Sequence, residues 1–141
     1  MSTQMETDYV KPLPLVEPEA KPFWDSLKAH DMKLQRCQEC SRWFFPPRTI
    51  CPNCLSENVE WTPVSGRGRV YSAVTYHISA HPSFTPQDLP YNVSIIELDE
   101  GVHVMGNVIG VPPEQVQIGV PVSVSYDDVT DEFTLARFRP A

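Results

Sequence analysis

The sequence predicts a mainly β protein in which one short helix and a four-cysteine ribbon precede a small five-stranded barrel. Two Cys-x-x-Cys pairs separated by ten residues indicate the ribbon. Five strand-like runs in the second half of the chain indicate the barrel. The 15 prolines among 141 residues also favour strands and loops over long helices.

The first 32 residues combine an arm with the helix. Residues 1–17 carry scattered charges and no hydrophobic periodicity, so we expect a flexible arm. Residues 18–32 are expected to form a helix, because Phe23, Trp24 and Leu27 make an apolar stripe at helical spacing. Two large aromatic side chains on so short a helix require a cover. Phe23 and Trp24 are therefore predicted either to pack on the ribbon or to contact a partner protein.

Residues 33–62 are expected to form the ribbon, with Cys37, Cys40, Cys51 and Cys54 as metal ligands. Four thiolates around zinc fill a tetrahedron, so the site would be structural and would leave no open position for a substrate. Iron could occupy the same cage, whereas disulfides would need an oxidising compartment. The N-terminus has neither the basic start nor the apolar run of a secretory signal, which predicts a cytoplasmic protein with reduced thiols.

The residue after each cysteine pair predicts the local backbone conformation. Ser41 and Leu55 occupy these two positions, where glycine often supplies a left-handed turn. A residue with a side chain costs about 1 kcal/mol in that conformation. Metal binding releases more free energy than this, so we expect both turns to form despite the missing glycines.

Residues 63–141 are expected to form the barrel. The runs with strand character are 68–79, 91–98, 102–109, 120–126 and 133–138, and residues 112–116 indicate one helical turn started by proline. A helical piece before the fourth strand is typical of an OB-fold. Five short strands also build other small barrels, so the pattern alone leaves the type of barrel open.

The net charge of −7 is spread unevenly along the chain. Residues 28–69 hold seven basic and four acidic side chains, whereas residues 70–141 hold two arginines and nine acidic side chains. An acidic barrel argues against nucleic-acid binding, which depends on phosphate neutralisation, although a small anion could bind at the basic segment. The apolar runs are too often interrupted by polar residues to span a membrane.

The sequence contains no recognisable catalytic motif, because it lacks a Ser-His-Asp signature, a phosphate-binding glycine loop and a dinucleotide fingerprint. The most informative loop is 65–69, where two glycines permit close approach of a ligand and Arg67 and Arg69 can bind phosphate, for example that of coenzyme A. The simpler interpretation is a hinge into the first strand. Arg48 is a third candidate phosphate contact, and Phe84 is predicted either to fold inward or to contact a ligand or partner.

These segments occur together in the order found in a known family. They are Pro22-Phe23-Trp24, the two cysteine pairs with Phe45-Pro46-Pro47-Arg48 between them, Trp61, Ser65-Gly66-Arg67-Gly68, His81-Pro82, Pro90-Tyr91, Glu97-Leu98, Gly106-Asn107, Ile118-Gly119, Pro121-Val122 and Phe138-Arg139-Pro140. The chain resembles the acyl-CoA-associated family, once catalogued as a domain of unknown function, with a rubredoxin-like zinc ribbon and a C-terminal OB-fold. The resemblance covers residues 18–141 and implies an OB-fold for the barrel.

The resemblance implies a non-catalytic accessory subunit. Members of the family are small subunits of thiolase-like acyltransferases or aldolases, or are fused to or associated with hydratases of acyl-CoA metabolism. The chain is therefore expected to bind structural Zn²⁺, to scaffold such an enzyme and to help position acyl-CoA. A nucleic-acid-binding module is the alternative, because ribbons and OB-folds also bind RNA or DNA.

Overall fold

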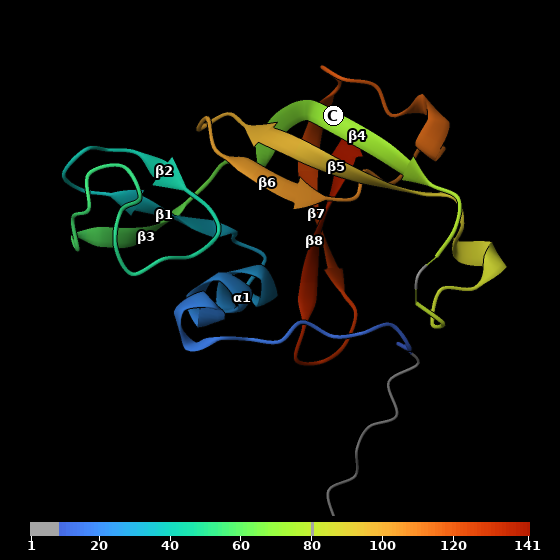
Figure 1. Cartoon of the computed structure of the whole chain (residues 1–141), viewed down its shortest axis with the longest axis horizontal. Coiled ribbons are helices and arrows are strands. Elements are labelled where there is room, and N and C mark those ends of the chain that lie inside the picture. Colours follow the sequence, from blue (N-terminus) through green and yellow to red (C-terminus); the bar gives the residue numbers. More distant parts are fainter. Residues whose placement is uncertain (1–8, 80) are drawn as a thin grey trace, which may run out of the picture.

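A short helix, a three-stranded ribbon and a five-stranded barrel follow one another along the chain (Figure 1). The computed structural model describes residues 9–79 and 81–141, so residues 1–8 of the expected arm lie outside the described part. Residues 9–17 precede the first helical turn and contain no helix or strand. The predicted mainly β fold class, with a four-cysteine ribbon before a curled antiparallel sheet, is confirmed.

Helix α1 (Lys21–Lys28) joins the ribbon to the barrel through its apolar stripe. The stripe buries Phe23 and Leu27, as the helical spacing predicts. Ser26 lies on the same face, and its hydroxyl donates to the carbonyl oxygen of Phe23 at 2.6 Å. The same hydroxyl accepts the N–H of Lys33 at 3.0 Å. This bond fixes the start of the next strand against the helix.

The ribbon is a small antiparallel sheet of β2 (Trp43–Phe44), β1 (Lys33–Cys37) and β3 (Val59–Pro63), in that order. Gln35 on the central strand is buried and makes two bonds to the backbone of Arg48. Its amide nitrogen donates to the Arg48 carbonyl at 2.6 Å, and its amide oxygen accepts the Arg48 N–H at 2.7 Å. One buried polar side chain thereby anchors the loop that leads to the second cysteine pair.

The barrel strands pair in the order β6-β5-β4-β7-β8. Their bounds are β4 (Arg67–Tyr76), β5 (Tyr91–Leu98), β6 (His103–Gly106), β7 (Pro121–Asp128) and β8 (Thr134–Pro140). Short 3₁₀ turns are found at Pro18–Ala20 before α1, at Pro86–Asp88 between β4 and β5, and at Pro113–Gln115 between β6 and β7. A parallel bridge between Val108 and Phe138 joins the end of the β6 segment to β8. The bridge links the two ends of the strand order, as in an OB-fold.

The glycine-rich segment 65–69 runs directly into β4, which begins at Arg67, one residue before the run 68–79 that the sequence predicts. Its second half belongs to β4, where Gly68 pairs with Leu98 on one side and Val122 on the other. A Cβ atom at Gly68 would lie 2.2 Å from the Glu97 carbonyl oxygen. Gly68 therefore serves the close approach of two strands, a requirement that sequence alone cannot distinguish from close approach of a ligand.

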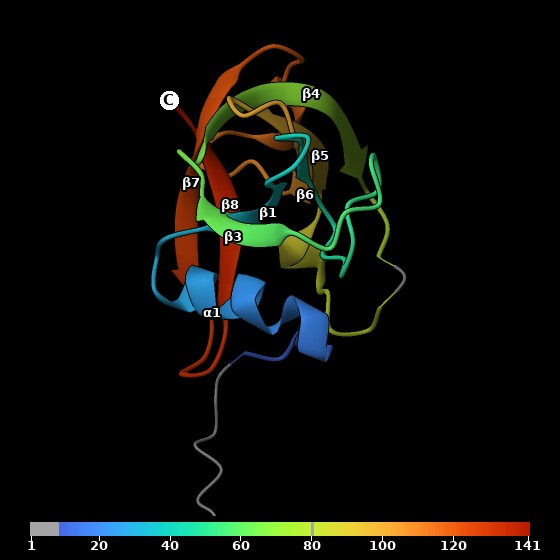
Figure 2. The ribbon, with the colours of Figure 1, turned by 90° about the vertical axis from the view of Figure 1, so that its left-hand side faces the viewer.

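Helix, ribbon and barrel share one hydrophobic core. Its buried members are Phe23, Leu27, Met32, Leu34, Val70, Ile96, Leu98, Val102, Val104, Val108, Val122 and Phe138. Figure 2 shows α1 beside β8, below the ribbon. Two bonds reinforce this junction: the Met32 N–H donates to the Tyr126 hydroxyl at 2.8 Å, and the Val64 N–H donates to the Met32 carbonyl at 3.0 Å. None of the helices in the described residues has the length and apolar character needed to cross a membrane.

Candidate functional site

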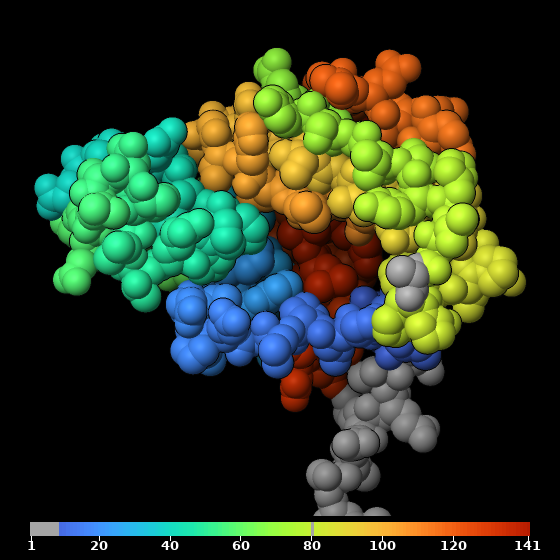
Figure 3. Space-filling model, viewed as in Figure 1, coloured from blue at the N-terminus to red at the C-terminus, as the bar shows by residue number. Residues whose placement is uncertain are grey.

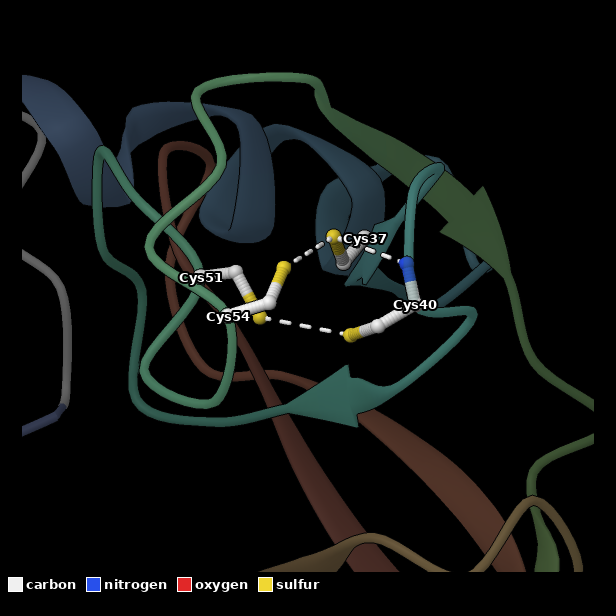
Figure 4. A group of neighbouring side chains, drawn as sticks. All are labelled: Cys37, Cys40, Cys51 and Cys54. Carbon is white, nitrogen blue, oxygen red and sulfur yellow. Dashed lines mark hydrogen bonds between the residues drawn. The ribbon is translucent and has the colours of Figure 1, made fainter.

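The four cysteine sulfurs converge on one point at the end of the ribbon (Figure 4). Cys37 ends β1, and Cys40 follows it in the first turn. Cys51 and Cys54 come from the second turn, between β2 and β3. All four Sγ atoms lie within 4.8 Å of one another. Within the described residues this is the one cluster of three or more Cys, His, Asp or Glu ligand atoms, as the spacing of the cysteines predicts.

The two turns that present the sulfurs have the predicted left-handed residues. Ser41 has φ = 64° and Leu55 has φ = 65°. Each closes its turn with a backbone bond, from Ser41 to the Cys37 carbonyl at 2.9 Å and from Leu55 to the Cys51 carbonyl at 3.0 Å. The turns also direct backbone N–H groups at the sulfurs, as in the 3.3 Å bond from Asn53 to Cys51 Sγ.

The sulfur separations fit a tetrahedral metal ion. Sγ of Cys37 lies 3.5 Å from Sγ of Cys54, and Sγ of Cys40 lies 3.6 Å from Sγ of Cys51. Zinc bonds of about 2.3 Å in a regular tetrahedron require sulfurs about 3.8 Å apart. A disulfide would need about 2.05 Å. The four thiols are free and surround a common centre.

The pKa values of Cys40 and Cys54, the two cysteines of the cage that are not fully buried, are shifted in opposite directions. Backbone hydrogen bonding from Arg42 and the side chain of Asn53 lower the pKa of Cys40 to about 6. The Ser56 N–H lowers the pKa of Cys54, but hydrogen bonding with Cys37 and burial outweigh it and raise that pKa to about 12. Without a cation the site therefore keeps a proton at Cys54, and a bound cation must displace that proton.

A second feature is a groove of about 610 Å³ that no residue of the ribbon lines. Apolar walls come from Phe84, Tyr91, Val108 and Leu135. Arg137 lies among them, and its Nε donates to Asp127 at 2.6 Å while a terminal nitrogen donates to Asn107 at 3.0 Å. The groove therefore combines apolar surface with one oriented guanidinium.

The segment before α1 forms one wall of this groove. Lys11 lines it, and its ammonium lies 3.2 Å from the Asp88 carboxylate and 5.1 Å from the centre of the Phe84 ring. The N–H of Thr85 and the Lys11 ammonium hold the pKa of Asp88 below its usual value. Sequence reasoning did not find Lys11 or Arg137 as groove residues, because they are 126 positions apart (137 minus 11) and neither lies in a motif.

The predicted phosphate contacts lie on two different parts of the fold. Arg67 and Arg69 are exposed and two residues apart on β4, so both side chains project from the same face of that strand. Arg48 is exposed on the ribbon loop, where its backbone bonds to Gln35. Their role as ligand contacts stays a prediction.

The aromatic residues on α1 pack within the chain. Phe23 is 8% exposed and its ring lies 5.2 Å from that of Phe45 in the ribbon. Trp24 lies 6.1 Å from Phe133, which follows the turn after β7. Phe23 therefore has little surface left for a partner, whereas Trp24 is only partly buried. Phe84 is also partly buried, with its ring 5.2 Å from Tyr91 at the groove.

Two family models match consecutive parts of the chain. Residues 24–60 match the "ChsH2, rubredoxin-like zinc ribbon domain", and residues 61–127 match the "ChsH2, C-terminal OB-fold domain". A solved structure is similar to nearly the whole chain. A chain of the "Ltp2-ChsH2(DUF35) aldolase" is 32% identical with a TM-score of 0.81, over 91% of this chain and 98% of that chain.

Curated relatives include subunits of several enzymes. A "Probable enoyl-CoA hydratase alpha subunit" of Thermomonospora curvata is 32% identical over 99% of this chain, which spans 43% of that protein's length. A "DUF35 domain-containing scaffold protein" of Methanocaldococcus jannaschii is 34% identical over 69% of this chain and 68% of its own. "Benzoylsuccinyl-CoA thiolase subunit BbsA" of Thauera aromatica is 32% identical over 60% of this chain and 56% of its own.

Proposed function

Because the chain belongs to the DUF35 family of zinc-ribbon and OB-fold proteins, we propose that it is a non-catalytic accessory subunit of a thiolase-like or aldolase enzyme that acts on acyl-CoA. The observation that carries this proposal is the likeness of nearly the whole chain to a DUF35 chain solved as part of an aldolase. The names of the relatives support the substrate class, since the hydratase and thiolase subunits are both named for CoA thioesters.

The chemistry of the described residues supports a non-catalytic role. The four thiols converge in one cage, so none is free as a nucleophile once a metal is bound. The histidine–carboxylate contacts in the described part, His30 with Asp128 and His103 with Glu97, lie at the exposed surface. Neither contact lines the groove. A catalytic partner would therefore supply the reacting groups.

Zinc is the metal that the cage fits best in this proposal. Four thiolates in a ribbon give a closed, four-coordinate structural site, and zinc has the ligand softness and tetrahedral geometry for it. When bound, the ion would cross-link the two turns that hold Cys37 and Cys51, which are fully buried. Elemental analysis of the purified chain tests this assignment, with one zinc per chain as the expected result.

The acyl-CoA would contact this chain through its basic side chains. Arg67 and Arg69 are the leading candidates for phosphate contacts, because both are exposed on one face of β4 beside the basic ribbon segment. The expected effect of changing both to glutamine is a higher KM for acyl-CoA in the assembled enzyme, with kcat retained. Changing both Lys21 and Lys28 to glutamine, an equal charge change on the exposed side of α1, is the matched control.

The proposed function is tested by co-expression. The chain would be produced together with thiolase-like, aldolase and hydratase proteins of the same genome, and each pair would be resolved by size-exclusion chromatography. We expect one such protein to co-elute stoichiometrically and to gain solubility or acyl-CoA turnover in the complex. If every candidate is equally soluble and active alone and none co-elutes, the proposal is wrong.

A further inference from the structure

The second half of β4 has an unpaired edge. β4 pairs with β5 along nearly its whole length, but with β7 only at Arg67–Arg69. The last bonds on the β7 side are those of Val70 with Val120 and Gly119. From Tyr71 to Tyr76, the backbone on that side makes no hydrogen bond to any described residue. Alternate N–H and C=O groups there point away from the sheet.

The sequence of this edge lacks most of the features that keep strands from pairing. Residues 71–76 read Tyr-Ser-Ala-Val-Thr-Tyr, with no charged residue and no proline. Native edges are usually protected by lysine, proline, bulges or very short length. The bulge between Val70 and Ser72 lies at the start of the segment, so the residues after it pair regularly with β5. None of the six residues is buried.

Apolar side chains accompany the free edge. Tyr71 and Val74 are each 54% exposed, and Tyr76 is 45% exposed. The Tyr76 ring stacks on Tyr91 of the neighbouring strand at 5.3 Å, which continues the apolar surface across the sheet. Figure 3 shows this part of β4 as yellow-green atoms along the upper surface of the barrel. The edge thus offers both hydrogen-bonding groups and apolar surface to an added strand.

The free edge of β4 could pair with a second copy of this chain or with a strand of another protein, and the charge of the barrel favours the second. The barrel, residues 63–141, carries four basic and nine acidic side chains, so two copies meeting edge to edge would repel each other. An uncharged or basic strand of another protein meets no such repulsion. We propose that β4 binds an extended segment of the catalytic partner as an additional strand, with its apolar side chains on Tyr71, Val74 and Tyr76. This inference rests on the proposed function and identifies the surface that the partner uses.

Backbone hydrogen exchange tests the strand addition directly. The full chain would be compared with its complex with the catalytic subunit found by co-expression. The expected result is at least about tenfold slower exchange within residues 71–76 in the complex, because newly bonded amides are protected. A complex that forms without any change in exchange over these residues would overturn the inference while leaving the accessory role intact.

A pair of charge substitutions tests the same edge in binding. Val74→Lys places a charge at the free edge on an exposed side chain, and we expect affinity for the partner to fall about tenfold or more. Leu15→Lys, at a residue that is 91% exposed before α1, is the matched control and should change affinity less than about twofold. Thermal unfolding of both variants checks that the fold is retained, and the exchange measurement on the wild-type chain does not depend on either variant.

The outcomes separate the two proposals. Failure of the wild-type chain to bind any thiolase-like, aldolase or hydratase protein would remove the proposed function and this inference together. Equal binding by Val74→Lys and the control, in a complex that forms, would remove the inference alone. Sedimentation that shows a wild-type dimer and a monomeric Val74→Lys variant, with partner binding unchanged, would assign the edge to a second copy and also overturn it.

Discussion

At Gly68 the barrel has no room for a side chain. A Cβ atom would meet the Glu97 carbonyl oxygen at 2.2 Å and the Leu98 Cα atom at 2.8 Å, both in backbone that cannot rotate away. We expect Gly68→Ala to lower the free energy of unfolding by about 3 kcal/mol, because β4 and β5 must separate to admit the methyl group. Urea unfolding measures the change.

Gly101→Ala is the control for this substitution. Gly101 has φ = 90° and open space around its Cβ position, so only backbone strain opposes a side chain there. We expect that variant to lose about 1 kcal/mol. Equal losses at the two positions would contradict the close packing of β4 on β5.

The pKa of Asp128 also depends on individual side chains that contact its carboxylate. Hydrogen bonds from the His30 ring and the Thr134 hydroxyl lower the pKa of Asp128 below its ordinary 3.8. A lowered pKa stabilises the fold above the ordinary value, and this stabilisation is lost as the pH falls through the pKa of the folded state. His30→Ala should therefore raise the Asp128 pKa toward 3.8 and move acid unfolding to higher pH.

Carboxyl-detected NMR titration follows the Asp128 pKa in the His30→Ala variant. His103→Ala, which removes the equivalent contact with Glu97 on the barrel surface, should leave the Asp128 pKa unchanged. An unchanged Asp128 pKa in the His30 variant would show that the ring does not stabilise the carboxylate.

At the scale of the elements, metal binding by the ribbon should depend on pH, because its cysteines must lose their protons to bind a cation. Cys40 has a pKa of about 6 and is mostly ionised at neutral pH, whereas Cys54, at about 12, keeps its proton until a cation displaces it. Zinc affinity should therefore fall as the pH is lowered from 8 to 6, because protons compete for the thiolates. Competition with a chelator at several pH values measures the affinity, and calorimetry in buffers of different ionisation enthalpy counts the protons. An affinity independent of pH would exclude ligation by these thiols.

The elements also show why prediction from sequence succeeded where it did. Strand β5 lies at Tyr91–Leu98, as expected, because Pro90 and the turn at residues 99–101 mark both of its ends. The left-handed turns at Ser41 and Leu55 follow from the cysteine spacing. The predicted end of β4 was less accurate, since strand character in the sequence continues to residue 79 but pairing with β5 stops at Tyr76. The end of β4 is set by where its pairing with β5 stops, and the local amino-acid composition does not reveal that position.

At the scale of the whole molecule, the charge distribution opposes the alternative function. The barrel is acidic and repels the phosphates of single-stranded DNA or RNA. This repulsion should cost more binding free energy than base stacking on exposed aromatic residues provides. We expect no binding of a labelled oligonucleotide at physiological salt in a fluorescence anisotropy titration. Retention that weakens with added salt would favour a nucleic-acid module instead.

Other features of the whole molecule could not be predicted from sequence. The groove brings Lys11, Phe84 and Arg137 together from three distant segments, and none of the three lies in a motif that points to the others. The cysteine cage was predictable because its four ligands repeat at a fixed local spacing. Groove residues, by contrast, become neighbours only through strand pairing and through the path of the segment before α1.

The continuous core has a practical consequence for dividing the chain. Cutting between residues 62 and 63 would separate Met32 and Leu34 from Val70 and Phe138, although all four are buried in one cluster. It would also break the hydrogen bond between the Met32 N–H and the Tyr126 hydroxyl, and it would expose an apolar surface on each fragment. We therefore expect a recombinant barrel alone to aggregate, because its apolar surface is covered by the helix and the ribbon in the full chain.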